Sequence, residues 1–560
     1  MHRAATRALR TTYRCTARTL TRSSRRGLLL PQQPSAAVAY GARQYHRNPA
    51  RSPQHAGHAI EPLQSSMYIR RFSAAFVSGL VGYGAWYTYN GNGTATDSHD
   101  AVARSFATTT ATTTSDAAAP TRTVLVIGAD ELHTGTYVGE GPISKTTGND
   151  GKRVVEMITP DQATEKLRKT EQSYFVNRGQ GVLRYDLVQL PSNDPIEDDH
   201  AEKIVEVPGR NGASDVPNSD WMFWGVFDGH SGWTTSAKLR QTLINTVANE
   251  LNDTYKAAPG HSPAAEAVEA AIKAGFTKLD DEIVHQSVEK VLNSGSKTMA
   301  AELLQPALSG SCALLSFYDS RSKLLRVACT GDSRAVLGRR SDSGKWTATA
   351  LSVDQTGSNP DEAARMRKLH PGEDRVTPPY VTAEPVVTTT KVNPENGDFL
   401  VLATDGLWEM LTNEEVVGLV GKWIETQASG SSSNSQFDST WARIFGSGNK
   451  PQLPVEHAKG QDVGGQKTPI RLQQWGISPD APERFVVKDK NVATHLVRNA
   501  LGGKNEEQVT ALLTLPAPFS RRYRDDLTVQ VIFFGNGSKT GEVVVNLEAT
   551  APEEPVKAKL

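Results

Sequence analysis

Cysteine is scarce in this chain of 560 residues, which has only Cys15, Cys312 and Cys329. Three cysteines exclude the disulfide framework of a small secreted domain, and their positions match no zinc-binding spacing. Cys312 and Cys329 lie in apolar runs and are expected to be buried free thiols. Because the chain is too long for one compact core, we expect one large domain with appendages.

Acidic residues and lysines are absent from residues 1–60, which hold eleven arginines and many Ser, Thr and Ala residues. This composition is typical of a mitochondrial transit peptide, and a disordered basic arm is the alternative. Without those arginines, 50 basic residues face 61 acidic ones, a net charge of −11. The body of the protein is therefore expected to bind no nucleic acid.

An uncharged stretch of eighteen residues, 72–89, follows two arginines. It just reaches the ~17–25 residues of a membrane-spanning helix. We expect a membrane segment or sorting signal that anchors the protein in the inner mitochondrial membrane; a buried or interfacial helix is the alternative. The C-terminal Ala558-Lys559-Leu560 resembles the peroxisomal Ser-Lys-Leu signal. A mitochondrial location is thus expected, with intermembrane space, matrix and a secondary peroxisomal destination left open.

Residues 91–120 are rich in Thr, Ala and Ser, and they predict a disordered linker. A folded domain is expected over 123–536, with a flexible insertion at 428–485 and a C-terminal tail at 537–560. Strands and helices come in blocks, which favours an antiparallel α+β sandwich over a doubly wound sheet. The expected helices are 235–256, 264–292, 359–369, 412–426 and 491–501, and the expected hairpin pairs strands 312–318 and 324–329.

Three apolar runs predicted as strands have an aspartate close to one end, namely Asp228, Asp405 and Asp525. An aspartate at the tip of a buried strand is costly to desolvate unless a positive group lies against it. We therefore expect the three to meet around a hard divalent cation such as Mg²⁺ or Mn²⁺. Gly229 allows close backbone approach, so its carbonyl is a further candidate ligand.

Two divalent cations about 3.5–4 Å apart can activate a water molecule and hold a phosphoryl oxygen for in-line attack. His230, two residues after Asp228, is the candidate general acid for the leaving alkoxide. Taken alone, Asp-Gly is a turn sequence and His230 a structural hydrogen-bonding residue. Their position directly after apolar runs favours a catalytic role.

These motifs resemble those of metal-dependent Ser/Thr protein phosphatases of the type 2C family. The matching segments occur in the family's order at 227–232, 309–313, 330–334, 352–355, 403–408 and 524–529. The resemblance implies an α+β fold, a four-layer α-β-β-α sandwich of two antiparallel sheets flanked by helices. It also implies a site for two Mg²⁺ or Mn²⁺ ions, with room for a third.

The resemblance also implies roles for particular residues. Asp228 would bridge both metals, and the Gly229 carbonyl would bind one of them. Asp405 and Asp525 would bind from the other side, and His230 matches the family's proposed general acid.

Further positions match the family less directly. Glu197 and Asp198 correspond to an early acidic pair that binds metal or its water. Asp332 and Glu409 stand where the family can hold a third, weaker ion. Many members grip substrate phosphate with an arginine four residues before the acidic pair, whereas this chain has Asn193, the candidate substrate-binding residue here.

The runs 182–198 and 359–362 are similar to those of pyruvate dehydrogenase phosphatases. Together with the transit peptide, they point to mitochondrial phosphoproteins as substrates, with the pyruvate dehydrogenase alpha subunit, and so the pyruvate dehydrogenase complex, first. This substrate assignment is an analogy rather than a consequence of the chemistry.

One element of the family pattern is missing between the helix expected at 359–369 and Val381. The family has a strand pair there carrying Ser-Arg-Ala-x-Gly-Asp, whereas this chain has only residues 370–380. Without this strand pair, a central sheet should have an exposed edge whose backbone N–H and C=O groups lack hydrogen-bond partners. A skipped exon, a truncated isoform and a degraded enzyme are the explanations, and the surviving ligands favour the first. The rival to an enzyme is a phosphatase-like scaffold or inactive isoform.

Overall fold

A computed structural model describes residues 120–128, 132–143, 152–209, 218–357, 359–369, 382–430, 453–456, 484–537 and 539–552. The expected transit peptide, the stretch 72–89, nearly all of the linker and the C-terminal tripeptide lie outside these residues. Within the described ranges, no helix combines the length and the apolar character that crossing a bilayer requires.

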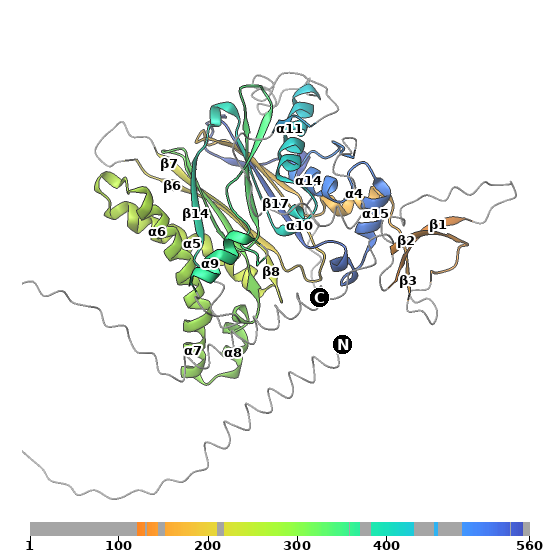
Figure 1. Cartoon of the computed structure of the whole chain (residues 1–560), viewed down its shortest axis with the longest axis horizontal. Coiled ribbons are helices and arrows are strands. Elements are labelled where there is room, and N and C mark those ends of the chain that lie inside the picture. The colour runs from red at the N-terminus through yellow and green to blue at the C-terminus, as the bar shows by residue number, and fades with distance from the viewer. Residues whose placement is uncertain are drawn as a thin grey trace, which may run out of the picture. The chain divides into compact units, whose positions relative to one another are not determined.

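The first large sheet has five strands in the order β14-β11-β10-β7-β6, and every neighbouring pair is antiparallel. Three of these strands, β6, β7 and β14, are labelled in Figure 1. The expected hairpin is confirmed, because β10 and β11 pair along their whole length. The five strands are β6 (Asp199–Val207), β7 (Ser219–Phe227), β10 (Ala313–Asp319), β11 (Leu324–Thr330) and β14 (Val386–Lys391).

The second large sheet has eight strands in the order β16-β13-β12-β15-β17-β5-β4-β18. Its pairs are antiparallel except β13 and β16, which run parallel, so the expectation of purely antiparallel sheets is wrong at this edge. The eight strands are β4 (Gln172–Val176), β5 (Val182–Leu190), β12 (Arg334–Arg340), β13 (Trp346–Ala350), β15 (Phe399–Ala403), β16 (Val455–Glu456), β17 (Leu527–Phe534) and β18 (Val543–Val545).

Three clusters of buried hydrophobic side chains separate four layers. The first cluster fills the space between the sheets, with Trp224 and Leu314 from one sheet and Leu400 and Ile532 from the other. The second packs the outer face of the five-stranded sheet against helices that follow β7. The third packs another group of helices against the outer face of the eight-stranded sheet. The α-β-β-α sandwich implied by the sequence resemblance is therefore present.

Most expected helices are present with shifted ends. The helix expected over 264–292 is interrupted, since a π-helical turn at Glu282–Gln286 separates two helices, and the Ser287 hydroxyl donates to the Glu282 carbonyl across it at 2.8 Å. The helices are α4 (Pro160–Arg168), α5 (Thr234–Ala257), α6 (Ala265–Asp281), α7 (Ser287–Ser294), α8 (Lys297–Leu303), α9 (Pro360–Leu369), α10 (Asp405–Trp408), α11 (Asn413–Gly430), α14 (Val492–Ala500) and α15 (Glu506–Thr514).

Several elements lie where the sequence predicted none. Within the expected insertion at 428–485, α11 continues to Gly430, and Val455–Glu456 forms β16 because Leu453 and Val455 pack against the core beside α11. Residues assigned to the tail at 537–560 form β18, whose backbone pairs with β4. A separate sheet precedes the sandwich and comprises β1 (Thr121–Ile127), β2 (Leu132–Val138) and β3 (Arg153–Glu156).

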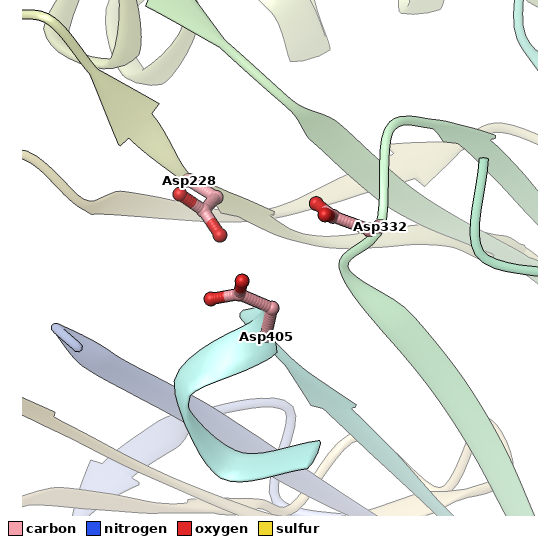
Figure 2. Close-up of side chains that lie close together, drawn as sticks. All are labelled: Asp228, Asp332 and Asp405. Carbon is pink, nitrogen blue, oxygen red and sulfur yellow. The ribbon is translucent and has the colours of Figure 1, made fainter. Parts of the chain in front are cut away.

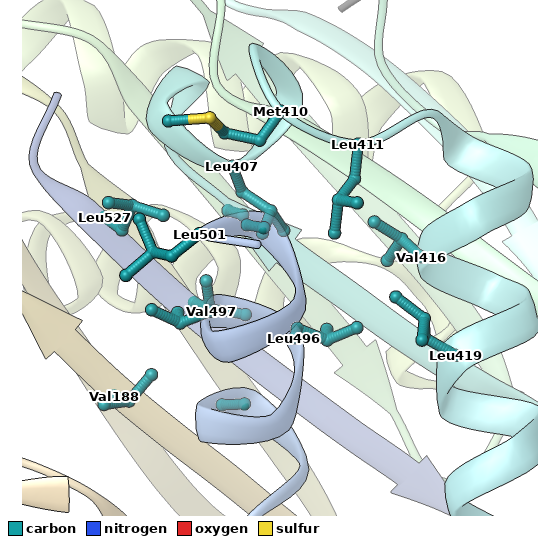
Figure 3. Packing of buried hydrophobic residues seen from close by; sticks show 14 of the residues in the cluster. Val188, Leu407, Met410, Leu411, Val416, Leu419, Leu496, Val497, Leu501 and Leu527 are labelled. Atoms are coloured by element: carbon teal, nitrogen blue, oxygen red, sulfur yellow. The ribbon is translucent and has the colours of Figure 1, made fainter. Parts of the chain in front are cut away.

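Packing beneath α10 fixes the position of its first residue, Asp405. Leu407 and Met410 are fully buried and belong to the same cluster as Leu496 and Val497 of α14 and Leu527 of β17 (Figure 3). These contacts come from three separate parts of the chain, so the end of β15 and the start of α10 have little freedom to move.

Shortening a side chain between the two sheets should destabilise the protein strongly. Leu400 has no exposed surface, so Leu400→Ala is expected to lower the free energy of unfolding by about 2–5 kcal/mol through lost burial and a cavity. Leu547 is 82% exposed, and Leu547→Ala should change it by less than about 0.5 kcal/mol. Urea unfolding followed by circular dichroism checks both; equal losses in the two variants would contradict this core.

Candidate metal centre

Three aspartates from separate elements bring their carboxylates together. Asp228 follows β7, Asp332 lies between β11 and β12, and Asp405 begins α10 after β15. One carboxylate oxygen of each lies within 4.8 Å of those of the other two, and Figure 2 shows the three groups facing a common space. The set offers only oxygen donors, which suits a hard divalent cation.

Electrostatics also favour a cation among these carboxylates. Burial raises the pKa of Asp228 well above its ordinary value, and the charges of Asp198, Asp332 and Asp525 raise it further. Burial raises the pKa of Asp405 as well, with Asp228 as the next contributor. Like charges held this close repel one another, and a bound divalent cation removes that cost. The residues therefore fit the metal ions that the sequence resemblance implies.

Asp525 and Glu409 lie near enough to the cluster for their charges to act on it. The charge of Asp525 acts on Asp228 and Asp405, and the charge of Glu409 acts on Asp405 and Asp525. Burial raises the pKa of Asp525 to about 6, although the Arg521 guanidinium donates a hydrogen bond to it and opposes the rise. The site is thus wider than its three closest carboxylates.

Asp198 is a buried residue whose charge acts on Asp228. Its carboxylate accepts hydrogen bonds from the Thr404 hydroxyl at 2.9 Å and the Thr528 hydroxyl at 2.8 Å. Burial raises its pKa well above the ordinary value, and the charge of Asp526 adds to the rise. Thr404 directly precedes Asp405, and Thr528 follows Asp525 by three residues, so Asp198 ties the end of β15 to the start of β17.

Asp526 is a residue of the site whose function the sequence did not reveal. It is 1% exposed and accepts hydrogen bonds from the Ser192 hydroxyl at 2.8 Å, the Asn193 N–H at 3.2 Å and the Glu197 N–H at 2.9 Å. The Ser192 N–H donates to the same oxygen as the Ser192 hydroxyl. Asp526 therefore shapes the loop that carries the early acidic pair. The sequence resemblance assigned Asp525 as a ligand, whereas the contacts of Asp526 with this loop appear only in the structure.

Gly229 lies where two backbones approach closely. A Cβ atom at this position would lie 2.0 Å from the Glu197 carbonyl oxygen, so only glycine fits. Gly229 and His230 form β8 (Gly229–His230), which pairs with β9 (Gly310–Ser311). His230 is exposed, and its charge acts on Asp332, which places it at the rim of the cluster.

The loop that carries Asp332 is held by other residues of the matching motifs. The Gly331 N–H donates to the Gln355 side chain at 2.9 Å, and Arg334 forms a buried ion pair with Asp354. The Cys312 thiol donates to the Asp332 carboxylate at 3.3 Å. Cys312 is half-buried rather than buried as expected, because it lines the site, whereas Cys329 is buried, and both are free thiols.

Asn193, the candidate substrate-binding residue, lies in the loop that Asp526 holds. Its backbone N–H binds Asp526, as described above, and its side chain carries no charge to attract a phosphate. The structure thus places the predicted residues around one centre: Asp228, Asp332 and Asp405 innermost, with Glu197, Asp198, Gly229, His230, Glu409, Asp525 and Asn193 around them.

Comparison with known proteins agrees with this geometry. A family model for protein phosphatase 2C matches residues 200–377 and 371–437. Pyruvate dehydrogenase [acetyl-transferring]-phosphatase 1, mitochondrial, of Saccharomyces cerevisiae is 38% identical, over 73% of this chain and 80% of the relative. The chain belongs to the protein phosphatase 2C family, and it is a metal-dependent protein serine/threonine phosphatase.

Other relatives carry related names. A protein phosphatase 2C homolog of Schizosaccharomyces pombe is 40% identical, over 67% of this chain and 85% of the relative. The human pyruvate dehydrogenase [acetyl-transferring]-phosphatase 1, mitochondrial, is 27% identical, over 68% of this chain and 83% of the relative.

The two segments matched by the family model overlap at 371–377, inside the region where the sequence lacks a strand pair of the family. Residues 370–381 lie outside the described structure. The next described strand, β14, pairs directly with β11 along six residues of each. Among the described residues, β14 is an edge strand of its sheet.

Removing the Asp526 carboxylate should damage both stability and metal binding. Asp526→Ala leaves four donors without their charged acceptor, so we expect a loss of on the order of 3 kcal/mol in the free energy of unfolding. Mn²⁺ affinity should also fall, because Glu197 and Asp198 lose their support. Denaturant unfolding and calorimetry measure the two effects, and Asp526→Asn should lie between alanine and the wild type. A wild-type unfolding midpoint in Asp526→Ala would contradict this role.

The acidic cluster should make the metal-free protein less stable as the pH rises. The folded-state pKa of Asp525 is about 6 against an ordinary 3.8, so the folded protein holds a proton that the unfolded chain has lost in this window. Its contribution is present at lower pH and is lost as the pH rises through about 6.

Urea unfolding in a chelator at about pH 5 and about pH 7.5 tests this expectation. The wild type should lose on the order of 1–3 kcal/mol more than the Asp228→Asn, Asp525→Asn double variant over that interval. Equal pH profiles of the two proteins would contradict the electrostatic account.

Proposed function

We propose that this protein removes phosphate from phosphoserine and phosphothreonine of mitochondrial proteins, using two Mg²⁺ or Mn²⁺ ions held by the acidic cluster. The observation that carries the proposal is the meeting of three carboxylates from distant parts of the chain within 4.8 Å. Bound divalent cations supply Lewis-acid stabilisation of phosphoryl oxygens and activation of water.

Different residues are proposed as ligands of the cations and as the proton donor. Asp228 has the innermost position and is proposed as the ligand shared by both ions, with the Gly229 carbonyl beside it. Asp405 and Asp525 are proposed as ligands from the opposite sheet. His230, exposed at the rim, is proposed to donate a proton to the leaving serine or threonine oxygen.

The remaining acidic residues are proposed to serve more weakly bound ions and water. Glu197 and Asp198 hold the edge of the site nearest Gly229. Asp332 and Glu409 are proposed to bind a third ion, and Asp332 supports this because its carboxylate belongs to the closest group. The ion that occupies the site in the cell depends on metal availability as much as on this set of oxygen donors.

The proposed substrates are mitochondrial phosphoproteins, with the alpha subunit of pyruvate dehydrogenase first. Relatives named as pyruvate dehydrogenase phosphatases support this choice, as does the arginine-rich start of the chain. The proposed location is the mitochondrion. Anchoring through 72–89 and a secondary peroxisomal destination stay proposals, which fractionation with protease protection tests.

Activity should depend on both the cation and Asp228. Asp228→Asn is expected to lower Mn²⁺-dependent hydrolysis of a phosphoserine peptide by at least about 100-fold, because the amide cannot supply the negative charge that holds the ions. Asp342→Asn, in an exposed turn, is the matched control and should act like the wild type. Phosphate release with Mn²⁺ and with a chelator is the measurement. A wild type without Mn²⁺-dependent turnover would favour the phosphatase-like scaffold instead.

A further inference from the structure

Arg521 places a positive charge at the edge of the acidic cluster. It belongs to a 3₁₀-helical turn, Phe519–Arg522, just before β17. Its guanidinium forms an ion pair with Asp525, and its side chain is 36% exposed. The guanidinium also interacts electrostatically with Asp526, Glu197 and Asp228. Arg521 therefore faces both the candidate metal ligands and the solvent from which substrate arrives.

The segment that carries Arg521 is joined to the segment that carries Asn193. The Ser520 hydroxyl donates to the Ser192 carbonyl, and Arg524 donates to the Pro191 carbonyl at 2.8 Å. The Asn193 N–H donates to Asp526 at 3.2 Å. Arg521 thus emerges beside Asn193, the candidate substrate-binding residue.

Neighbouring cations are less suited to meet a phosphate. Arg524 is 1% exposed, and two of its guanidinium nitrogens donate to backbone carbonyls. His230 interacts electrostatically with Asp332 and is already proposed as the proton donor to the leaving group. Arg521 has a planar fork of five N–H donors, and a fork of this kind binds two phosphate oxygens at once.

We propose that Arg521 binds the phosphate group of the substrate, beside the candidate substrate-binding residue Asn193. This inference rests on the proposed function. The rival role is purely local: Arg521 would only neutralise Asp525 and would never contact substrate. The two roles differ in whether removal of the guanidinium changes phosphate affinity or only metal affinity.

Arg521→Gln, Arg521→Lys and the control Arg522→Gln, an exposed arginine next in sequence, separate the two roles. Calorimetry gives the affinity of each Mn²⁺-loaded protein for inorganic phosphate and, separately, the affinity of each metal-free protein for Mn²⁺. We expect Arg521→Gln to weaken phosphate binding about tenfold to hundredfold, with Arg521→Lys intermediate and Arg522→Gln unchanged. KM for a phosphoserine peptide should rise in the same order, with Mn²⁺ affinity not reduced.

A charge-restoring variant sharpens the test. Asn193→Arg added to Arg521→Gln should recover most of the lost phosphate affinity. Unchanged phosphate affinity in Arg521→Gln, or no recovery in the double variant, would overturn the inference. If Arg521→Gln fails to fold, Arg521→Lys decides, because wild-type phosphate affinity without the bidentate fork contradicts the proposal. A wild type that does not hydrolyse phosphopeptide refutes the proposed function itself, whereas an active wild type equal to Arg521→Gln refutes only this inference.

Discussion

Repulsion among half-buried carboxylates that lie close together is the constraint on which this structure depends. Asp228, Asp332 and Asp405 have their oxygens within 4.8 Å, and burial raises the pKa of each carboxyl. Charges within the group raise the pKa of Asp228 and of Asp405 further. Such an arrangement is unfavourable without positive charge. The fold must therefore hold the carboxylates in place against their repulsion, and a bound divalent cation offsets that repulsion.

The sandwich holds the carboxylates in place because they lie at the ends of strands from both sheets. Asp228 follows β7 in the five-stranded sheet, whereas Asp405 follows β15 in the eight-stranded sheet. The cluster between the sheets fixes the distance between those two ends. Core packing therefore determines the geometry of the site, because neither carboxylate can shift without moving a buried strand.

Acidic residues serve two purposes here, and only their partners distinguish them. Asp526 accepts hydrogen bonds from a serine hydroxyl and from backbone N–H groups, and these bonds order the loop beside the site. Asp198 accepts hydrogen bonds from two threonine hydroxyls, and these bonds order the strand ends. Asp525, one residue from Asp526, instead faces Arg521 and the cluster. Hydrogen-bonded carboxylates of this kind support a site by holding its ligands in position.

The sequence by itself determined the family of the fold, the hairpin of β10 and β11, the long helix α5 and the set of acidic residues, because apolar periodicity and motif order are local signals. It did not determine that Asp332 joins the innermost group, that Asp526 shapes the 192–197 loop, or that β16 and β18 complete a sheet. Those features depend on contacts between residues tens to hundreds of positions apart. Only the packed tertiary structure shows how the contacts of the adjacent Asp525 and Asp526 differ, because those contacts come from residues that the local sequence does not contain.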